Sequence, residues 1–475
     1  MSGKDLIVTT DRGAVRGVWR GSSAAFLGIP FAEPPVGDLQ FSAPVARRPW
    51  EGVRDATRPG ATAQVASLYD NTTIPEPSTP GDDILNLNVF TPDPGAASLP
   101  VLVWIHGGAY TAGCQNSPWY DGGTFNADGV VTVSLGYRLG IPAWLEVPDA
   151  PANRGALDWV AGLRWVRDNI AAFGGDPDRV TIAGQSAGGG AVLDLLSMPA
   201  AQGLFARAMA ISAAVDDQSL AHAFRIAHQL TGKTGFSTAD EYSRFDRQQL
   251  DDLARSLSDP GRWDDHLALV PYVDGAVIPQ PVVPALRSGK GAVPLLIGST
   301  TQEFCDIAPR IPPLSVEQAE AVLVHIGVSP AAAAELSAAY LGRIGEVIGQ
   351  AVTDVIFRQL VLDVASAHAS VAPTWVYEFD WRSRCENRPG LAFHCLDLPF
   401  WWNRLDGERV VAATGANPPQ GLAAAMHGAM TSFIKGDSPG WAQAASTDLH
   451  AKVWQDPPTT ACGYENVIDR WPHGH

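Results

Sequence analysis

The stretch FGGDPDRVTIAGQSAGGG, residues Phe173–Gly190, decides the fold of this chain of 475 residues. Within it, Val180–Ala183 is a short β-branched run typical of a buried strand. Ala187–Met198 is rich in small residues and leucine, which favours a helix. Ser186 lies at the corner between the two. The pattern therefore predicts a sharp strand-to-helix turn that lifts a serine hydroxyl clear of a sheet.

The residues two positions before and after this serine are Gly184 and Gly188, and only small residues let such a turn close tightly. The turn also brings the first backbone N–H groups of the helix near the serine, where negative charge develops during acyl transfer. This is the nucleophile elbow of an α/β-hydrolase, provided that the rest of the chain agrees. In a chain with 47 glycines, G-x-S-x-G alone is weak evidence.

Composition bounds the size of the core and disfavours two classes of partner. With 46% hydrophobic residues the chain can bury a large core, and its length alone allows two or three domains. A formal net charge of −17 disfavours nucleic acids and anionic membrane surfaces as partners.

The cysteines favour a reducing compartment. There are five, an odd number, scattered without C-x-x-C spacing, which fits free thiols better than a disulfide framework or a zinc site: Cys114, Cys305, Cys385, Cys395 and Cys462. The N-terminal MSGKDLIVTT lacks the apolar segment of a signal peptide, and no stretch approaches the length of a membrane span. A soluble cytoplasmic protein is therefore expected.

The order of elements predicts an α/β fold with a mainly parallel central sheet covered by helices on both faces. Leu157–Phe173 has apolar residues at helical spacing, and the Pro- and Gly-rich Phe26–Phe41 predicts a long irregular loop. A hairpin is expected at Asp5–Trp19. Further strands are expected at Leu85–Phe90, Val101–Ile105, Val130–Ser134, Arg207–Ser212, Pro294–Ile297 and Thr374–Phe379.

A helical pattern occupies the region between the last two of these strands. Ser315 with Gln318 forms a capping-box signature, Ser329-Pro330 is an N-cap followed by proline, and Ala351–Ala369 is rich in alanine, valine and leucine. We expect one catalytic domain over residues 1–475 with a helical subdomain, residues 310–372, inserted in it.

Several segments carry a resemblance to a known family. Taken together, the chain resembles the type B carboxylesterase (carboxylesterase/cholinesterase) family of α/β-hydrolases, from about Val8 to Trp471. The matching segments are GIPFAEPPVG (Gly28–Gly37), DDILNLNV (Asp82–Val89), WIHGGAY (Trp104–Tyr110), YRLG (Tyr137–Gly140), FGGDPDRVTIAGQSAG (Phe173–Gly188), PYVDG (Pro271–Gly275) and AFHCLDLPF (Ala392–Phe400).

The chain departs from the family pattern at two places. Ile84 stands where members often have a half-cystine, and no cysteine precedes Cys114, so the early disulfide of secreted members is absent. Phe304 stands where the family usually has a glycine directly after the catalytic acid.

Acyl transfer needs a nucleophile and a base to take its proton. Ser186 is the expected nucleophile. Among eleven histidines His394 is the expected base, because AFHCLDLPF matches the family's histidine loop and lies downstream of the serine. His106, before the double glycine, is the alternative base, although a role in shaping that loop is favoured.

The acid must be a carboxylate within hydrogen-bond reach of the imidazole. Glu303 follows the apolar strand Pro294–Ile297, whose C-terminal end delivers it to the active-site face, and the resemblance implies the same residue. Asp397 and Asp306 are the competitors. The expected order along the chain is Ser186, Glu303, His394.

The oxyanion hole is expected from the backbone N–H groups of Gly107, Gly108 and Ala187, since glycine permits close approach of the backbone to the tetrahedral oxygen. The alternative is that Gly107-Gly108 only ends a strand. Ser212 resembles the family's second serine and is expected either to hydrogen-bond near the triad or simply to end its strand.

Aromatic residues flank the oxyanion and histidine loops and are expected either to line the substrate pocket or to belong to the core. They are Trp119, Tyr120, Phe400, Trp401 and Trp402. Cys305 and Cys395, beside the expected acid and base, have no basic partner of their own in sequence and are expected to be buried neutral thiols.

The sequence therefore predicts a serine hydrolase of carboxylic esters that needs no metal or organic cofactor and acts on a small-molecule ester. The same triad suits an amide, carbamate or thioester, and the sequence does not separate these. A non-catalytic binding module is the remote alternative, disfavoured because Ser186, Glu303 and His394 are all present. Oligomeric state is unreadable from the sequence.

Overall fold

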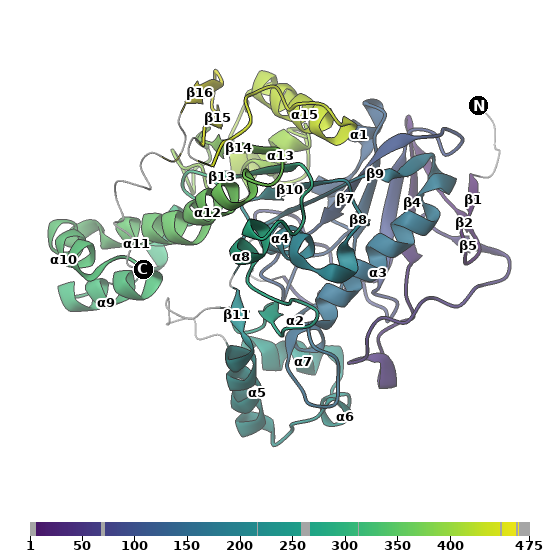
Figure 1. Ribbon diagram of the computed structural model, residues 1–475, viewed down its shortest axis with the longest axis horizontal. Helices are drawn as coiled ribbons and strands as arrows, with labels where there is room; N and C mark the ends of the chain where they lie inside the picture. Colours follow the sequence, from purple (N-terminus) through teal and green to yellow (C-terminus); the bar gives the residue numbers. More distant parts are fainter. Residues whose placement is uncertain are drawn as a thin grey trace.

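The computed structural model describes residues 6–67, 72–215, 217–257, 267–311, 313–446, 449–461 and 464. These residues form an 11-stranded sheet with helices packed on both of its faces (Figure 1). The strands, in order across the sheet, are β16 (Thr459–Ala461), β15 (Ala451–Trp454), β14 (Thr374–Phe379), β13 (Leu295–Thr300), β10 (Arg207–Ile211), β9 (Gly175–Gln185), β7 (Leu99–Ile105), β8 (Val131–Leu135), β6 (Asn86–Thr91), β4 (Ser23–Pro30) and β3 (Val18–Arg20). Two small sheets contain β1 (Ile7–Thr9), β2 (Ala14–Arg16) and β5 (Val53–Asp55), and β11 (Gln218–Ser219) and β12 (Tyr272–Val273).

The α-helices lie mostly in the connections between these strands. They are α1 (Gly123–Ala127), α2 (Gly140–Trp144), α3 (Arg154–Asn169), α4 (Ala187–Ser197), α5 (Leu220–Thr234), α6 (Ala239–Tyr242), α7 (Arg247–Arg255), α8 (Val282–Arg287), α9 (Val316–Ile326), α10 (Pro330–Ala339), α11 (Ile344–Val352), α12 (Gln359–His368), α13 (Leu398–Trp401), α14 (Val410–Thr414) and α15 (Gln420–Lys435). Among the described residues, no helix combines the length and the apolar character needed to cross a membrane.

The centre of the sheet is parallel and its edges are antiparallel. Strands β8, β7, β9, β10, β13, β14 and β15 pair in parallel, whereas β3, β4, β6 and β16 join in antiparallel pairs. A central parallel strand is buried on both faces and therefore has a continuous apolar sequence. In β7, Val101, Val103 and Ile105 pack into one core while Leu102 and Trp104 pack into the other.

Different helices cover the two faces. Helices α3, α4, α8 and α12 pack around β9, β10, β13 and β14 on one face, and α1, α13 and α15 belong to the other. This arrangement confirms the predicted mainly parallel sheet with helices on both sides.

Most predicted elements are present, but the structure differs from the prediction over part of Phe26–Phe41 and within Ala351–Ala369. The structure confirms the predicted hairpin, as β1 and β2, and the strand that leads to the corner at Ser186, as β9. It also confirms the helix predicted from Leu157, as α3 followed by a 3-10 turn at Ile170–Phe173. The predicted loop Phe26–Phe41 instead begins as strand β4, which extends to Pro30. Gly28, with φ +71°, lies where the pairing of β4 with β6 shifts register, so the glycine accommodates a bulge inside a buried strand.

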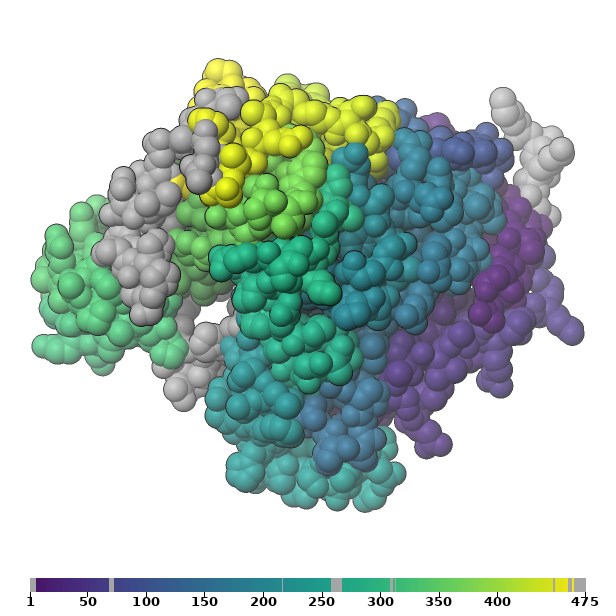
Figure 2. All heavy atoms as spheres, viewed as in Figure 1, coloured from purple at the N-terminus to yellow at the C-terminus, as the bar shows by residue number. Residues whose placement is uncertain are grey.

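Helices α9 to α12 lie between β13 and β14, and α9, α10 and α11 project from one end of the molecule (Figures 1 and 2). The predicted caps at Ser315 and Ser329 are present at the starts of α9 and α10. The predicted helix Ala351–Ala369 is interrupted, because a π-helix over Thr353–Arg358 separates α11 from α12.

The corner between β9 and α4 is as tight as the sequence predicts. Ser186 has φ 59° and ψ −126°, a conformation that residues with a side chain rarely adopt. A Cβ atom added at Gly184 would lie 2.2 Å from the carbonyl oxygen of Gly188. One added at Gly188 would lie 2.1 Å from the carbonyl oxygen of Ile105 on β7. A side chain at either position would overlap neighbouring backbone atoms, so both positions require glycine.

Replacing Gly188 with alanine should destabilise the protein, because the new methyl group overlaps the backbone of β7. Overpacking of this kind reduces the free energy of unfolding by about 1–3 kcal/mol. Gly428→Ala is the matched control: Gly428 is exposed on α15, nothing lies within 4 Å of its added Cβ, and the change should be neutral or stabilising. Thermal unfolding followed by circular dichroism compares the two, and equal midpoints would contradict the contact.

Candidate active site

The corner presents Ser186 at the carboxyl end of β9. Ser186 is half-buried, whereas Gln185 and Ala187 on either side of it are buried. Its backbone N–H donates to the carbonyl of Ile211 at 3.0 Å, and its own carbonyl accepts from the N–H of Gly190 at 2.9 Å. The backbone of the strained residue is thus fixed by hydrogen bonds on both its N–H and its carbonyl side.

Glu303 and His394 meet beyond the ends of two neighbouring strands, β13 and β14. His394 Nδ1 lies 2.5 Å from Glu303 Oε2, and the backbone N–H of His394 donates to the carbonyl of Glu303 at 2.9 Å. The other carboxylate oxygen of Glu303 accepts from the N–H of Thr300 at 2.7 Å. Glu303 is fully buried, and the His394 side chain keeps 17% of its surface exposed.

This pairing sets the role of each imidazole nitrogen. With the Nδ1 proton donated to Glu303, Nε2 carries the lone pair that can accept a proton. The side-chain nitrogen of Gln185, the residue before Ser186, lies 3.2 Å from Nε2, and its oxygen accepts from Cys395 Sγ at 3.4 Å. Sequence reasoning missed Gln185, although its place next to the serine puts it at the site.

The surroundings of His394 favour its protonated form. Burial works against the charged imidazolium, but the adjoining Cys395 sulfur and the Glu303 carboxylate outweigh burial and raise the pKa of His394 well above its ordinary value. Burial raises the pKa of the Cys395 thiol and keeps it uncharged at neutral pH, so the thiol supplies no negative charge. We therefore attribute the raised pKa of His394 to the Glu303 carboxylate.

The competing carboxylates have other partners. Asp397 Oδ2 accepts from Tyr377 Oη at 3.3 Å and from Trp401 Nε1 at 3.2 Å. Burial, and then the charge of Glu303, raise the pKa of Asp397 to about 7. Asp306 forms an ion pair with Arg388 at 3.3 Å.

His106, the alternative base, is built into the loop before Gly107. Its ring is buried and stacks on Tyr137 with centroids 4.4 Å apart, and its Nδ1 lies 2.8 Å from the carbonyl oxygen of Gly107. Burial lowers the pKa of His106 to about 4. These contacts fit a residue that shapes the loop.

Gly107 and Gly108 bring backbone against the serine. A Cβ atom on Gly107 would lie 2.6 Å from the carbonyl oxygen of Gln185 and 3.1 Å from Ser186 Cβ. Gly108 has φ +113°, and a Cβ there would lie 2.2 Å from the carbonyl oxygen of Ala112. Ala187 is the first residue of α4, so its N–H has no partner within the helix.

Ser212 and the flanking aromatic residues belong to the interior. Ser212 Oγ is buried and has no hydrogen-bond partner in the described part of the chain, so the hydrogen bond considered for it is not seen. The five aromatic residues considered for the pocket, Trp119, Tyr120, Phe400, Trp401 and Trp402, are all buried in one hydrophobic core. The core alternative therefore describes them better than pocket lining.

Two other aromatic residues contact the imidazole. The Phe304 ring stacks on that of His394 with centroids 5.0 Å apart and an interplanar angle of 27°. The Phe357 ring, from the π-helix, lies 5.3 Å from His394 and 5.4 Å from Phe304. The departure from glycine at position 304 signalled a difference here, but nothing in the sequence near His394 pointed to Phe357.

The cysteines near the pair are not activated. Burial raises the pKa of Cys305 to about 12, and burial also raises that of Cys395. Cys114, Cys305, Cys385 and Cys395 are free, and Cys462 lies outside the described residues.

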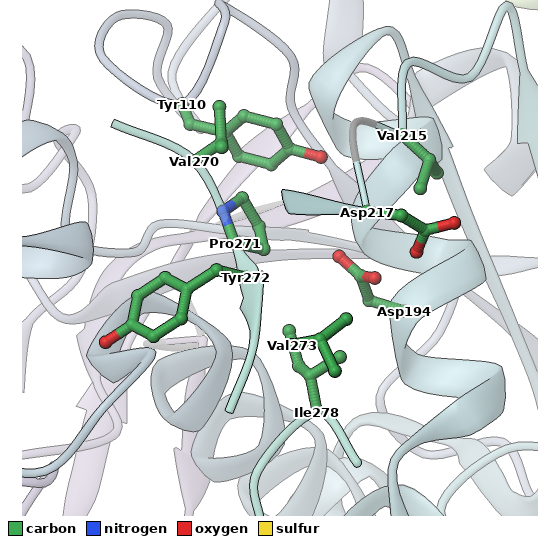
Figure 3. Close-up of a pocket in the computed structure, with 9 residues that line it drawn as sticks. All are labelled: Tyr110, Asp194, Val215, Asp217, Val270, Pro271, Tyr272, Val273 and Ile278. Atoms are coloured by element: carbon green, nitrogen blue, oxygen red, sulfur yellow. The ribbon is translucent and has the colours of Figure 1, made fainter. Parts of the chain in front are cut away.

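A pocket lies beside α4 (Figure 3). Its walls include Tyr110, Asp194, Asp217 and Val270–Val273, and none of Ser186, Glu303 and His394 lines it. Burial, and then the charge of Asp217, raise the pKa of Asp194 well above its ordinary value. Within the described ranges, no group of three or more His, Cys, Asp or Glu residues is arranged to hold a metal ion.

Comparison with known proteins identifies the family of this chain. Residues 4–464 match the model of the "Carboxylesterase family". The para-nitrobenzyl esterase of Bacillus subtilis is 35% identical over 458 residues, covering 91% of this chain and 90% of that protein. The phenmedipham hydrolase of Pseudarthrobacter oxydans is 31% identical, with 91% of this chain and 90% of that protein covered.

A solved carboxylesterase of Geobacillus stearothermophilus superposes with a TM-score of 0.84 at 30% identity, over 98% of this chain and all of the other. Solved para-nitrobenzyl esterases give similar values, and together these structures confirm the predicted α/β-hydrolase fold. The chain therefore belongs to the carboxylesterase family and is a carboxylic ester hydrolase.

Proposed function

We propose that Ser186, His394 and Glu303 form the catalytic triad and that hydrolysis passes through an acyl-enzyme on Ser186. His394 Nε2 takes the proton of the Ser186 hydroxyl while Ser186 Oγ attacks the ester carbonyl. The tetrahedral intermediate then collapses, and the imidazolium returns the proton to the departing alcohol. Water, deprotonated by the same nitrogen, then attacks the acyl group. The second collapse breaks the bond to Ser186 Oγ, which takes the proton back from the imidazolium, and the acid is released.

The bond between His394 Nδ1 and Glu303 carries this proposal. A buried carboxylate 2.5 Å from Nδ1 fixes the tautomer whose Nε2 is basic and stabilises the imidazolium that forms in both steps. Asp397 and Asp306 are occupied by other partners, which supports Glu303 over both.

The N–H groups of Gly107, Gly108 and Ala187 are proposed as the oxyanion hole. The close approach of Gly107 to Ser186 supports this assignment, as does the position of the Ala187 N–H at the start of α4, where it has no partner within the helix. Such donors stabilise the negative charge that develops on the carbonyl oxygen in the transition state. One donor typically lowers the activation free energy by about 3 kcal/mol.

The proposed substrate is a small-molecule carboxylic ester, as the names of the relatives indicate for those proteins. The runner-up is an amide, carbamate or thioester cleaved by the same residues, because the leaving group and not the triad distinguishes these reactions. The cysteines within the described residues are free thiols, which supports the proposal of a reducing, cytoplasmic location.

Replacing Ser186 tests the nucleophile. Hydrolysis of p-nitrophenyl esters from acetate to long acyl chains should fall at least about a thousandfold in Ser186→Ala. Ser197→Ala, at the far end of the same helix, should retain activity because its hydroxyl donates to the carbonyl of Asp194. Unchanged turnover in Ser186→Ala would refute the triad. A wild type that is inert on every ester but labelled at Ser186 by a fluorophosphonate would favour the runner-up.

The acid is tested by two conservative changes. Glu303→Gln keeps the shape but removes the charge that orients and stabilises the imidazolium, so kcat should fall by about 10³ to 10⁴. Asp397→Asn should stay within about tenfold of wild type, because Asp397 bonds Tyr377 and Trp401. Measured kcat on one p-nitrophenyl ester decides between them, and the reverse ranking would assign the role to Asp397.

The dependence of rate on pH follows from the state of His394. Only the neutral imidazole can accept the serine proton, so kcat/KM should rise with pH and level off once His394 is deprotonated. Since its pKa is raised, the midpoint should lie above the ordinary 6.5. In Glu303→Gln the residual activity should show a lower midpoint, because the raising carboxylate is gone. A profile that is flat between about pH 5 and 8 would contradict His394 as the base.

A further inference from the structure

Phe304 covers one face of the imidazole that the proposed function uses as its base. Its ring lies nearly parallel to that of His394 at 5.0 Å between centroids, an offset stacked geometry. With Phe357 the three rings form a triangle whose sides are 5.0, 5.3 and 5.4 Å. A glycine at position 304 could supply none of this contact.

Residues of α11 and of the π-helix, which lie between β13 and β14, hold the backbone of Phe304 in place. The backbone N–H of Phe304 donates to Thr353 Oγ1 at 3.1 Å, and that hydroxyl donates to the carbonyl of Gly349 at 2.9 Å. A Cβ atom on Gly349 would lie 2.8 Å from the carbonyl oxygen of Phe304, so α11 packs directly on this turn. Gln350 adds a bond to the carbonyl of Thr301 at 3.2 Å.

The π-helix supplies the second ring. Single π-helical turns within α-helices frequently occur at functional sites. Here the turn over Thr353–Arg358 contains both Thr353, which holds Phe304, and Phe357, which contacts His394. Arg358 pairs with Asp354 of the same turn at 2.7 Å, and it anchors the turn to the sheet through Glu378 on β14 at 2.6 Å.

A stacked aromatic ring has two effects on a catalytic imidazole. Glu303 holds Nδ1 and the Gln185 side-chain nitrogen lies 3.2 Å from Nε2, so both contacts lie in the plane of the ring. A flat neighbour on the face of the ring restricts the tilt of that plane further. The face of a phenylalanine ring is also negative, so it attracts a cation within about 6 Å more than a neutral group. The imidazolium, which forms as Ser186 attacks, therefore gains more from Phe304 than the neutral imidazole does.

We infer that Phe304 is a positioning residue for His394, which fixes the plane of the imidazole and stabilises its protonated form during acyl transfer. This inference rests on the proposed function, in which His394 is the base. It assigns the insertion a part in the reaction, because Thr353 and Phe357 come from it.

The test compares pH profiles of Phe304 variants on one p-nitrophenyl ester. Phe304→Leu keeps apolar contact but removes the aromatic face, and Phe304→Tyr keeps the face. Phe224→Leu is the matched control, because Phe224 is 54% exposed on α5. The titratable groups that interact with His394 are Glu303, Cys395 and Asp397, and all variants retain them.

In Phe304→Leu the midpoint of the acid limb of kcat/KM should fall by about half a pH unit. Its kcat on the plateau should fall about threefold, with KM unchanged. Phe304→Tyr and Phe224→Leu should match the wild type. Phe304→Gly, the residue usual in the family, should show the same shift as leucine, which guards against a folding defect specific to one variant; thermal midpoints are measured for all.

An unmoved acid limb in Phe304→Leu would overturn the inference, as would a change confined to KM, which would make Phe304 a wall of the substrate pocket. These results are distinguishable from failure of the proposed function. If His394 were not the base, the wild type itself would lack the acid limb. A failure of the inference alone would leave the limb in the wild type and would show no difference in its position among the variants.

Discussion

Helix α4 and strand β7 approach so closely at Gly188 that no side chain fits between them, and the rest of the site depends on this contact. It forces the chain to turn within one residue and leaves Ser186 with positive φ. Such strain persists only where the surroundings over-determine the conformation. The Ser186 N–H donates to the carbonyl of Ile211, and the Ser186 carbonyl accepts from the N–H of Gly190. These bonds, with the packing of Gly107 against Ser186, provide that restraint.

The parallel order of the sheet explains why residues distant in sequence meet. Strands β9, β10, β13 and β14 are neighbours, and the residues after their carboxyl ends include Ser186, Ser212, Glu303 and His394. Burial of Glu303 on that edge strengthens its bond to the imidazole, because water does not screen the charge. The sheet thereby sets both the geometry and the electrostatics of the pair.

Local patterns predicted the backbone of the site well. The strand, the corner and the small residues around Ser186 could be read from the sequence because the turn allows only glycine at positions 184 and 188. The sequence did not predict the end of β4, because the glycine that the register shift at Gly28 requires, with the prolines that follow, is typical of a loop.

Side-chain surroundings were harder to predict, since they join segments far apart in sequence. The contact of Phe357 with His394 comes from a π-helix inside what reads as one continuous helix. The aromatic residues near the histidine loop could not be assigned to pocket or core, because composition does not report which face of a loop is covered. They lie in the core that packs α13 and α15 against the sheet.

The placement of α9 to α12 has a consequence for protein engineering. Both ends of this segment return to adjacent parallel strands, β13 and β14, whose register the sheet fixes independently. Exchanging or shortening α9 and α10, which project from the body of the molecule, leaves those anchor points unchanged (Figure 1). Residues 349–358, by contrast, contact the turn that carries Glu303, so this short stretch is the part of the module that a graft must preserve.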